Sequence, residues 1–288
     1  MGNLQDKMAA GFVVTSELVP PKGTDIQSLL DTASMLKGYV DAFNITDSHS
    51  ARMRLAPVAA AHMLIDHGVE PILQMVTRDR NRIAIQSDML GADVLGITNL
   101  VCMGGDPPHI GDHPDAKPVY DLSSDEVISV ANALNNGSDY AGNKLNQSTN
   151  LHIGAVVNPG ASDLDTEIAK MEKKANAGAR FFQTQAVYDV EAFQNFMSAI
   201  AHLDVTVIAG IMPIKSVKMA EYANEKIPGI CIPESMIQEI ADADDVAECS
   251  IRIASDLITA LQPVCGGVHI MALGAEDRIP RILDRVRA

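Results

Sequence analysis

The sequence is short of basic residues and of long hydrophobic runs, and each shortage excludes a class of partner. Its 22 lysines and arginines stand against 37 aspartates and glutamates, which gives a formal net charge of −15. Nucleic acids and anionic membranes are bound through basic surfaces that meet phosphate groups, so we expect neither as a partner. Residues 1–12 lack the basic and apolar segments of a secretory signal, and no later apolar run could span a bilayer. We therefore expect a cytoplasmic protein.

Paired cysteines and the common catalytic motifs are also missing. The cysteines are Cys102, Cys231, Cys249 and Cys265, and no two of them have the spacing of a metal-binding pair. That predicts free thiols, a reducing compartment and no structural zinc. His109 and His113 lie in a proline- and glycine-rich segment that is not helical, so we expect no metal there. No P-loop, HExxH helix or Ser–His–Asp arrangement is recognisable, which disfavours phosphoryl transfer and hydrolysis.

What the sequence does contain is clearest between residues 69 and 108. An apolar run of strand length at 71–76 leads into charged residues, and the helical pattern that follows should end at Gly91. A second apolar run at 94–103 is followed by GGDPP at 104–108. Parallel strands joined by crossover helices carry their ligand sites beyond the carboxyl ends of the strands. The loops after these two strands are therefore expected to belong to a functional site.

The same strand-then-helix unit recurs along the chain, roughly every thirty residues, as in α/β proteins with parallel sheets. Eight segments are predicted to be strands, at residues 11–16, 40–45, 71–76, 94–103, 151–157, 180–185, 205–210 and 267–272. Helical patterns are found at residues 25–37, 55–67, 83–90, 121–134, 163–177, 189–200, 216–223, 233–261 and 275–286. This repeat predicts one (β/α)8 barrel, a TIM barrel, as a single domain over residues 1–288. An open doubly wound sheet is the rival, but the GxGxxG turn after its first strand is absent.

Polar residues stand at or just after the carboxyl ends of most of these strands. They are Glu17, Thr46, Gln74, Asp106, Asn158, Gln185 and Lys215. A barrel brings these positions to one mouth, where two carboxylates among amides indicate acid catalysis and stabilisation of a cation. Taken singly, Glu17 is more typical of a salt-bridged surface carboxylate, and the polar loop after Thr46 is more typical of a helix cap. The residues alone predict a barrel enzyme that binds a polar heterocycle or a cofactor.

A series of short motifs extends over nearly the whole chain. They are SELVPPK at 16–22, TRDRNRIAIQSDMLG at 77–91, GGDPP at 104–108, AGA at 177–179 with TQ at 184–185, and GIMP at 210–213. In this order and combination, the chain resembles the methylenetetrahydrofolate reductase family, and most closely its short members that consist of the catalytic domain alone. The resemblance implies a flavin-containing barrel that interconverts 5,10-methylenetetrahydrofolate and 5-methyltetrahydrofolate, with a tetrahydrofolate as its substrate.

The resemblance also implies roles for individual residues. Glu17 would be the general acid that opens the five-membered ring of the substrate to an iminium, a role that a raised pKa would suit. Asp106 would lie against the flavin and the pterin and stabilise developing positive charge, and Gln185 would contact folate or nicotinamide. The flavin is expected to be FAD, with FMN as the alternative. The positions that match flavin contacts are Thr46, Met103, Gly104, Gly105, Asp106, Tyr120, Ala155, Glu167 and Lys174.

Alternatives stay open for two groups of basic residues. Lys174 meets a phosphate of the cofactor, or is a solvated lysine late in an amphipathic helix. The arginines of segment 78–82 bind pyrophosphate near the start of a helix, or only pair with surface charges.

Two departures from the family concern the electron donor. Some members have an aromatic residue that stacks on the nicotinamide where this chain has Val217, and Asn-Arg after the last strand where it has Gly274 and Ala275. These differences imply poor use of NADH, an electron-donating protein subunit, or operation in the oxidative direction. We also expect a homo-oligomer. The competing hypothesis is a pterin-binding barrel that serves as an accessory or methyl-transfer subunit.

Overall fold

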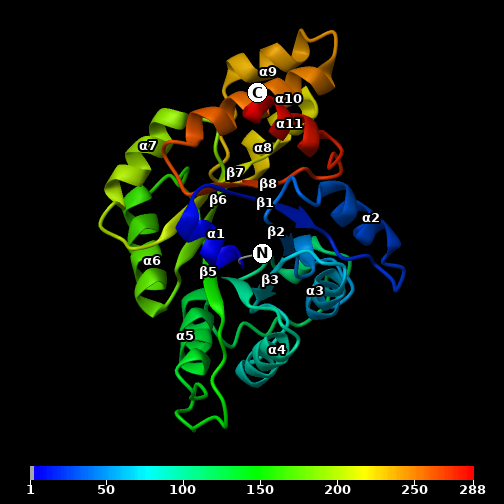
Figure 1. The fold of residues 1–288 in the computed structure, drawn as a ribbon. Coiled ribbons are helices and arrows are strands. Elements are labelled where there is room, and N and C mark those ends of the chain that lie inside the picture. The colour runs from blue at the N-terminus through cyan, green and yellow to red at the C-terminus, as the bar shows by residue number, and fades with distance from the viewer. Residues whose placement is uncertain (1–2) are drawn as a thin grey trace.

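The computed structural model describes residues 3–288, which form a closed barrel of parallel strands in sequence order. The strands are β1 (Val13–Leu18), β2 (Ala42–Ile45), β3 (Pro71–Val76), β4 (Asn99–Met103), β5 (His152–Val157), β6 (Phe181–Ala186), β7 (Thr206–Ile211) and β8 (Gly267–Ile270). β1 pairs with both β2 and β8, which closes the ring, and helices surround it (Figure 1). The predicted TIM barrel is confirmed. Residues 1 and 2, which the predicted domain includes, lie outside the described part of the chain.

Helices pack on the outside of the sheet, and several of them begin with a side-chain cap. They are α1 (Leu4–Ala10), α2 (Gln27–Leu36), α3 (Pro57–Asp66), α4 (Arg82–Val94), α5 (Ser124–Asn135), α6 (Leu164–Ala177), α7 (Val190–Ala199), α8 (Val217–Lys226), α9 (Glu234–Ala241), α10 (Val246–Leu261) and α11 (Arg278–Arg287), with the 3-10 turns η1 (His49–Ala51) and η2 (Pro108–Ile110). Asn81 caps α4, and Ser123 with Glu126 forms a capping box on α5. No helix within residues 3–288 combines the length and hydrophobicity needed to cross a membrane.

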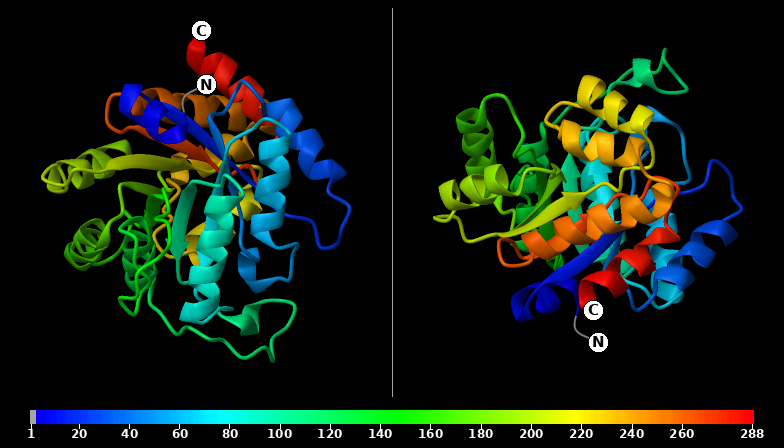
Figure 2. Two further views of the ribbon diagram at one scale, coloured as in Figure 1. Left: turned by 60° about the horizontal axis from the view of Figure 1, so that its bottom comes forward. Right: turned by 90° about the horizontal axis from the view of Figure 1, so that it is seen from above.

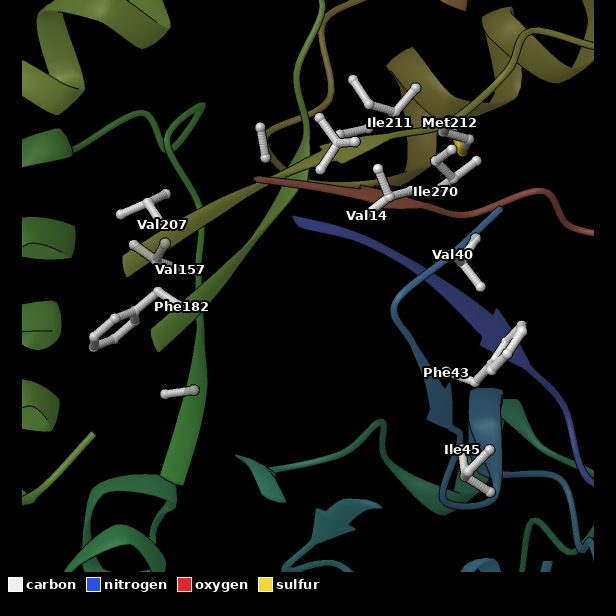
Figure 3. Packing of buried hydrophobic residues seen from close by; sticks show 14 of the residues in the cluster. Val14, Val40, Phe43, Ile45, Val157, Phe182, Val207, Ile211, Met212 and Ile270 are labelled. Carbon is white, nitrogen blue, oxygen red and sulfur yellow. The ribbon is translucent and has the colours of Figure 1, made fainter. Parts of the chain in front are cut away.

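Two apolar layers follow from the alternation of side chains along the strands. The outer layer lies between the sheet and the helices and includes Phe43, Phe182 and Val207 (Figure 3). The inner layer fills the barrel and includes Val13, Ala42, Ile72, Val101, Phe181 and Ile208. Because both faces of a parallel sheet are covered, β3 is buried at every residue.

We call the end of the barrel where the strands begin the floor, and the end where they finish the mouth. Helix α1, which the sequence pattern does not reveal, closes the floor. Leu4 is fully buried in the inner layer, and its N–H donates to Glu70 Oε1 at 2.7 Å. Asn3 caps the helix by accepting from the N–H of Asp6. Figure 2 shows α1 and α11 at the same end of the barrel.

The predicted end of the first strand at residue 16 is wrong. β1 continues to Leu18, because Glu17 and Leu18 pair in register with β2 before the prolines that follow. Glu17 is therefore part of the strand, two residues after Thr15. Every second residue of a strand points to the same face, so Glu17 and Thr15 share the inward face of the barrel.

The predicted boundary at Gly91 is also wrong. Helix α4 continues through Gly91 to Val94, and Gly96, with φ of +79°, takes the left-handed conformation that follows its end. A glycine inside a helix costs only about 1 kcal/mol relative to alanine, which burial of the helix face at Ala92 can offset. The strand predicted from residue 94 begins only at Asn99. The other predicted segments contain helix or strand of the expected kind, with ends that differ by a few residues.

Candidate active site

Towards the mouth, the side chains that point into the barrel become polar. Thr15 follows Val13 by two residues, and Gln74 follows Ile72 by two residues, so both continue the inward face of the apolar inner layer. His269 of β8 pairs in register with Thr15. All three polar residues are buried. The interior of the barrel thus changes from apolar at the floor to polar beneath the mouth.

Glu17 lies next to a histidine that is itself held in place. Its Oε1 is 3.7 Å from His269 Nε2, and its side chain is 17% exposed. His269 Nδ1 lies 2.9 Å from Thr15 Oγ1, which is 3.4 Å from the carbonyl oxygen of Val268. The Thr15 hydroxyl donates to the carbonyl of Val268 and therefore accepts from Nδ1–H of His269. The other ring nitrogen of His269, Nε2, faces the carboxyl group of Glu17.

The surroundings of Glu17 lower its pKa below the ordinary value. Burial alone would raise it, but the hydrogen bond and charge of His269, the charge of His49 and a hydrogen bond with Gln74 outweigh burial. The expectation of a raised pKa is therefore wrong. The reason is His269, a partner that comes from the other end of the chain.

The loop after β4 is held by one side-chain donor for each of its first three carbonyls. Thr77, Tyr120 and Arg78 donate, in that order, to the carbonyl oxygens of Gly104, Gly105 and Asp106 at 3.3, 3.2 and 3.2 Å. Because a peptide unit is planar, fixing these carbonyls also fixes the N–H groups of Gly105 and Asp106, which point away from the three donors. The carboxylate of Asp106 is exposed on a backbone that cannot swing freely.

The two glycines of this loop serve different purposes. Gly105 has a φ of +84°, and a Cβ there would lie 2.9 Å from Val76, so the turn requires glycine. A Cβ at Gly104 would meet no heavy atom within 4 Å, so the missing side chain leaves open space at the exit of β4. Tyr120 is held at a φ of +41°, which is strained for a residue other than glycine.

Gln185 lies where β6 leaves its regular pairing with β7. The register shifts between Gln183 and Ala186, and the hydroxyl of Thr184 accepts from the N–H of Gly210 at 2.9 Å. Irregularities of this kind often redirect a side chain next to an active site. The Oε1 of Gln185 accepts from the N–H of Ala186 at 3.0 Å, which leaves its NH2 group available to a ligand.

Thr46 directly follows β2, and Met103 is the last residue of β4. Thr46 is fully buried, and its hydroxyl has no hydrogen-bond partner anywhere in residues 3–288. A buried hydroxyl without a partner costs free energy, so it marks a place where a polar atom of a ligand would bind. Met103 is half-buried and packs against the inner layer.

Three predicted cofactor residues lie on the outer side of the sheet and do not point into the barrel. Ala155 is in the outer layer, paired in the sheet between β4 and β6. Glu167 accepts from the N–H of Asn158 at 3.0 Å, and Lys174 donates to the carbonyl of Val156 at 2.7 Å. Lys174 is therefore not solvated, and burial lowers its pKa. Glu167 and Lys174 of α6 therefore hold the carboxyl end of β5 in place.

The remaining predicted residues connect loops or pair charges. Asn158 donates to the carbonyl of Pro228 at 3.1 Å, and Lys215 donates to the carbonyl of Leu273. The arginines of segment 78–82 form the ion pairs Arg78–Asp79 at 2.6 Å, Arg80–Asp47 at 2.6 Å and Arg82–Asp121 at 2.9 Å. Charge pairing is therefore observed, although the side chain of Arg78 is buried and not on the surface, and binding of pyrophosphate stays a prediction. Across residues 3–288, no group of three or more His, Cys, Asp or Glu could hold a metal ion.

Two residues beside Glu17 are not identified by the sequence motifs. His269 lies in the predicted last strand, and Thr15 lies in the predicted first strand. A signal is present in both cases, because each is a polar residue on the inward-facing alternation of an otherwise apolar strand. Nothing in either strand indicates that they meet each other.

Known proteins share sequence similarity with this chain. Methylenetetrahydrofolate reductase 2 of Schizosaccharomyces pombe is 26% identical over 301 aligned residues, covering 98% of this chain and 46% of that protein. The 5,10-methylenetetrahydrofolate reductase of Escherichia coli is 31% identical over 111 residues, which are 36% of this chain and 37% of that protein. Nearly the whole chain aligns with the two S. pombe relatives, but it spans only about half of their length.

Solved structures share the fold. An uncharacterized protein from Clostridium thermocellum that binds two copies of 5-methyl-5,6,7,8-tetrahydrofolic acid superposes with a TM-score of 0.65 at 18% identity, covering 98% of this chain and 97% of that one. The family described as methylenetetrahydrofolate reductase matches residues 3–287. The chain therefore belongs to the methylenetetrahydrofolate reductase family.

Proposed function

We propose that the protein is a flavin-dependent oxidoreductase that interconverts 5,10-methylenetetrahydrofolate and 5-methyltetrahydrofolate. The observation that carries the proposal is the cluster of Glu17, His269 and Gln74, which shares the mouth with the glycine-rich loop that ends in Asp106. Family membership supports the reaction, and the structural neighbour from C. thermocellum binds a folate of the same class.

Glu17 would move the proton that accompanies opening and closing of the five-membered ring. Opening needs a proton on a bridge nitrogen, and closing gives that proton back. Because its pKa is lowered, Glu17 is ionised at neutral pH and suited to accept the proton when the ring closes, in the oxidative direction. In the opposite direction, a folate that displaces water from the mouth strengthens the effect of burial, which raises the pKa and favours the acid form.

Asp106 and Gln185 would orient the substrate. The exposed carboxylate of Asp106, on its fixed backbone, would stabilise the positive charge that develops when the ring opens. The free NH2 group of Gln185 would donate to a carbonyl of the pterin or of nicotinamide. Asp106 comes from the loop after β4 and Gln185 from β6, so a flat ring bound between them would face Glu17 of β1.

The residues at the exits of β2 and β4 fit a flavin, with FAD favoured over FMN. A bound flavin would supply the hydride that reduces the methylene carbon of the opened folate to a methyl group. The hydroxyl of Thr46 would donate to a polar atom of its ring, which gives the unpartnered group a bond. The open space at Gly104 would let the ring lie against the backbone of the loop.

The electron donor is proposed to be a partner protein rather than NADH. Val217 begins α8 and is half-buried, so an aliphatic side chain occupies the position where some relatives stack an aromatic ring. After β8, Leu273 and Gly274 both have positive φ and form a turn that offers no amide or guanidinium side chain.

Anaerobic absorbance spectroscopy tests the proposed function. The purified protein should carry a stoichiometric, non-covalent flavin, and 5-methyltetrahydrofolate should bleach its visible absorbance. Mass analysis of the released cofactor distinguishes FAD from FMN. A colourless protein that binds 5-methyltetrahydrofolate but neither flavin would contradict the proposal and favour the pterin-binding accessory hypothesis.

A further inference from the structure

Asn44 of β2 and Gln183 of β6 form a closed pair of amides inside the barrel. Asn44 Nδ2 donates to Gln183 Oε1 at 2.6 Å, and Gln183 Nε2 donates to Asn44 Oδ1 at 2.9 Å. Both side chains are buried. Because β2 and β6 stand on opposite sides of the eight-stranded ring, the pair spans the barrel.

The pair lies next to two residues of the proposed site. Asn44 is the in-register neighbour of Glu17 on the adjacent strand. Gln183 precedes Gln185 by two residues on β6. One amide therefore sits beside the residue proposed to move the proton, and the other sits below the residue proposed to orient the substrate.

β6 needs such an anchor because its ladder to β7 is interrupted just above Gln183. The register holds at Gln183 with Ile208 and resumes only at Ala186 with Gly210. Between these points the backbone ladder on that side does not fix the position of Gln185. Gln183 is the last residue that pairs regularly with β7 below the interruption, and its side chain is bonded to Asn44 on the opposite wall.

We propose that the Asn44–Gln183 pair is a positioning element that fixes Gln185 relative to Glu17, an inference that rests on the proposed folate reaction. Each amide gives the other one donor and one acceptor, so the link has a set length across the barrel. Amides do not titrate in the physiological range, so the link adds no charge beneath Glu17 and His269. Both side chains are buried and bonded to each other, so we assign them a positioning role and no part in the chemistry.

Three variants separate positioning from packing. Gln183→Leu leaves the amide of Asn44 buried without its partner and should lower the melting temperature. Asn44→Leu with Gln183→Leu removes both polar groups, which should restore the melting temperature without restoring the link. Asn44→Gln with Gln183→Asn exchanges the two amides and keeps both the contact and its total length.

The first readout is the rate at which 5,10-methylenetetrahydrofolate reoxidises the reduced flavin. We expect this rate to fall about tenfold to a hundredfold in the double leucine variant, as for a misplaced orienting group. The exchanged pair should stay close to the wild-type rate, and reduction of the flavin by reduced viologen should be unchanged in both. A double leucine variant with the wild-type folate rate would show that the pair is only structural.

A crystal structure of the double leucine variant gives a readout that does not depend on the reaction. We expect Gln185 to be displaced relative to Glu17 or to lose its single conformation. An unchanged Gln185 contradicts the proposal whatever the activity is. If wild-type protein shows no folate turnover, the proposed function fails, and the same structure still decides whether the amide pair positions Gln185.

Discussion

At the floor of the barrel, polar side chains satisfy one another within the chain, whereas at the mouth some are left without partners. Glu70 Oε1 accepts from the N–H of Leu4 at 2.7 Å and from the amide of Asn99 at 2.8 Å, and Asn99 in turn faces His152. At the mouth, the buried hydroxyl of Thr46 has no partner in residues 3–288. Hydrogen bonding therefore favours stability at one end of the barrel and leaves capacity for a ligand at the other.

Backbone strain follows the same division. Non-glycine residues with left-handed φ are found in the loops after β2, β4 and β8, all at the mouth; they are Ser48, Ser50, Ala51, Tyr120 and Leu273. Loops at the floor place glycines in this conformation instead, among them Gly38, Gly68, Gly96 and Gly178. A strained residue costs on the order of 1 kcal/mol or more, and such residues cluster at functional sites. The loops at the mouth therefore contain backbone strain that the floor loops avoid by placing glycine in the left-handed conformation.

The largest expected effect of a single change is at Glu17. Glu17→Gln removes the group proposed to move the proton, so turnover of 5,10-methylenetetrahydrofolate should fall by roughly a hundredfold or more. Reduction of the flavin by an artificial donor should be retained, because that step needs no proton transfer to the folate. Rapid-mixing absorbance measures both steps, with the exposed Glu191→Gln as the matched control. A parental folate rate in Glu17→Gln would show that the role is wrong.

At the floor, the corresponding change should affect stability and leave chemistry intact. Leu4→Ala empties a fully buried position beneath the inner layer, and such changes cost roughly 2–5 kcal/mol of the free energy of unfolding. Denaturant unfolding measures the loss, and Gln5→Ala on the exposed face of α1 is the control. The folate rate of Leu4→Ala below its unfolding transition should match the wild type. A reduced rate in the folded variant would mean that the two ends are coupled.

His152, at the floor, should make the free energy of unfolding depend on pH. Burial lowers its pKa from 6.5 to about 4, so the folded protein resists a proton that the unfolded chain accepts. Its contribution is therefore complete above about pH 6.5 and is lost as the pH falls towards 4, a change of roughly 3 kcal/mol. His152→Gln keeps a donor for Asn99 and should flatten this part of the stability profile. An equally steep profile in the variant would assign the pH dependence to other groups.

The barrel could be predicted because its signal is repeated and local. Each strand is an apolar run with a break after it, and each helix has an apolar stripe, so errors at single ends such as Gly91 do not change the topology. Helix α1 could not be recognised in the same way. It has only seven residues, and its place depends on the burial of Leu4 and on the bond to Glu70, 66 residues away.

Only the residues of the candidate site that lie at strand ends could be predicted from the sequence. Glu17, Gln74 and Gln185 are polar residues where strands finish, and a barrel gathers such positions at one mouth. His269 and Thr15 lie 254 residues apart, and their contact exists only because β8 closes the ring against β1. The same long-range contact explains why the pKa of Glu17 is lowered when an isolated buried carboxyl would have a raised one.

The smallest expected effect concerns the electron donor at the mouth. Val217→Phe adds an aromatic face at the start of α8, which is worth about 1 kcal/mol for a stacked nicotinamide, or roughly a fivefold gain in the rate of flavin reduction by NADH. Val217→Leu enlarges the apolar side chain without adding a ring and is the control. Anaerobic stopped-flow should show slow bleaching of the wild-type flavin by NADH and NADPH and fast bleaching by reduced viologen. Rapid, saturable bleaching of the wild type by NADH would remove the need for a partner protein as donor.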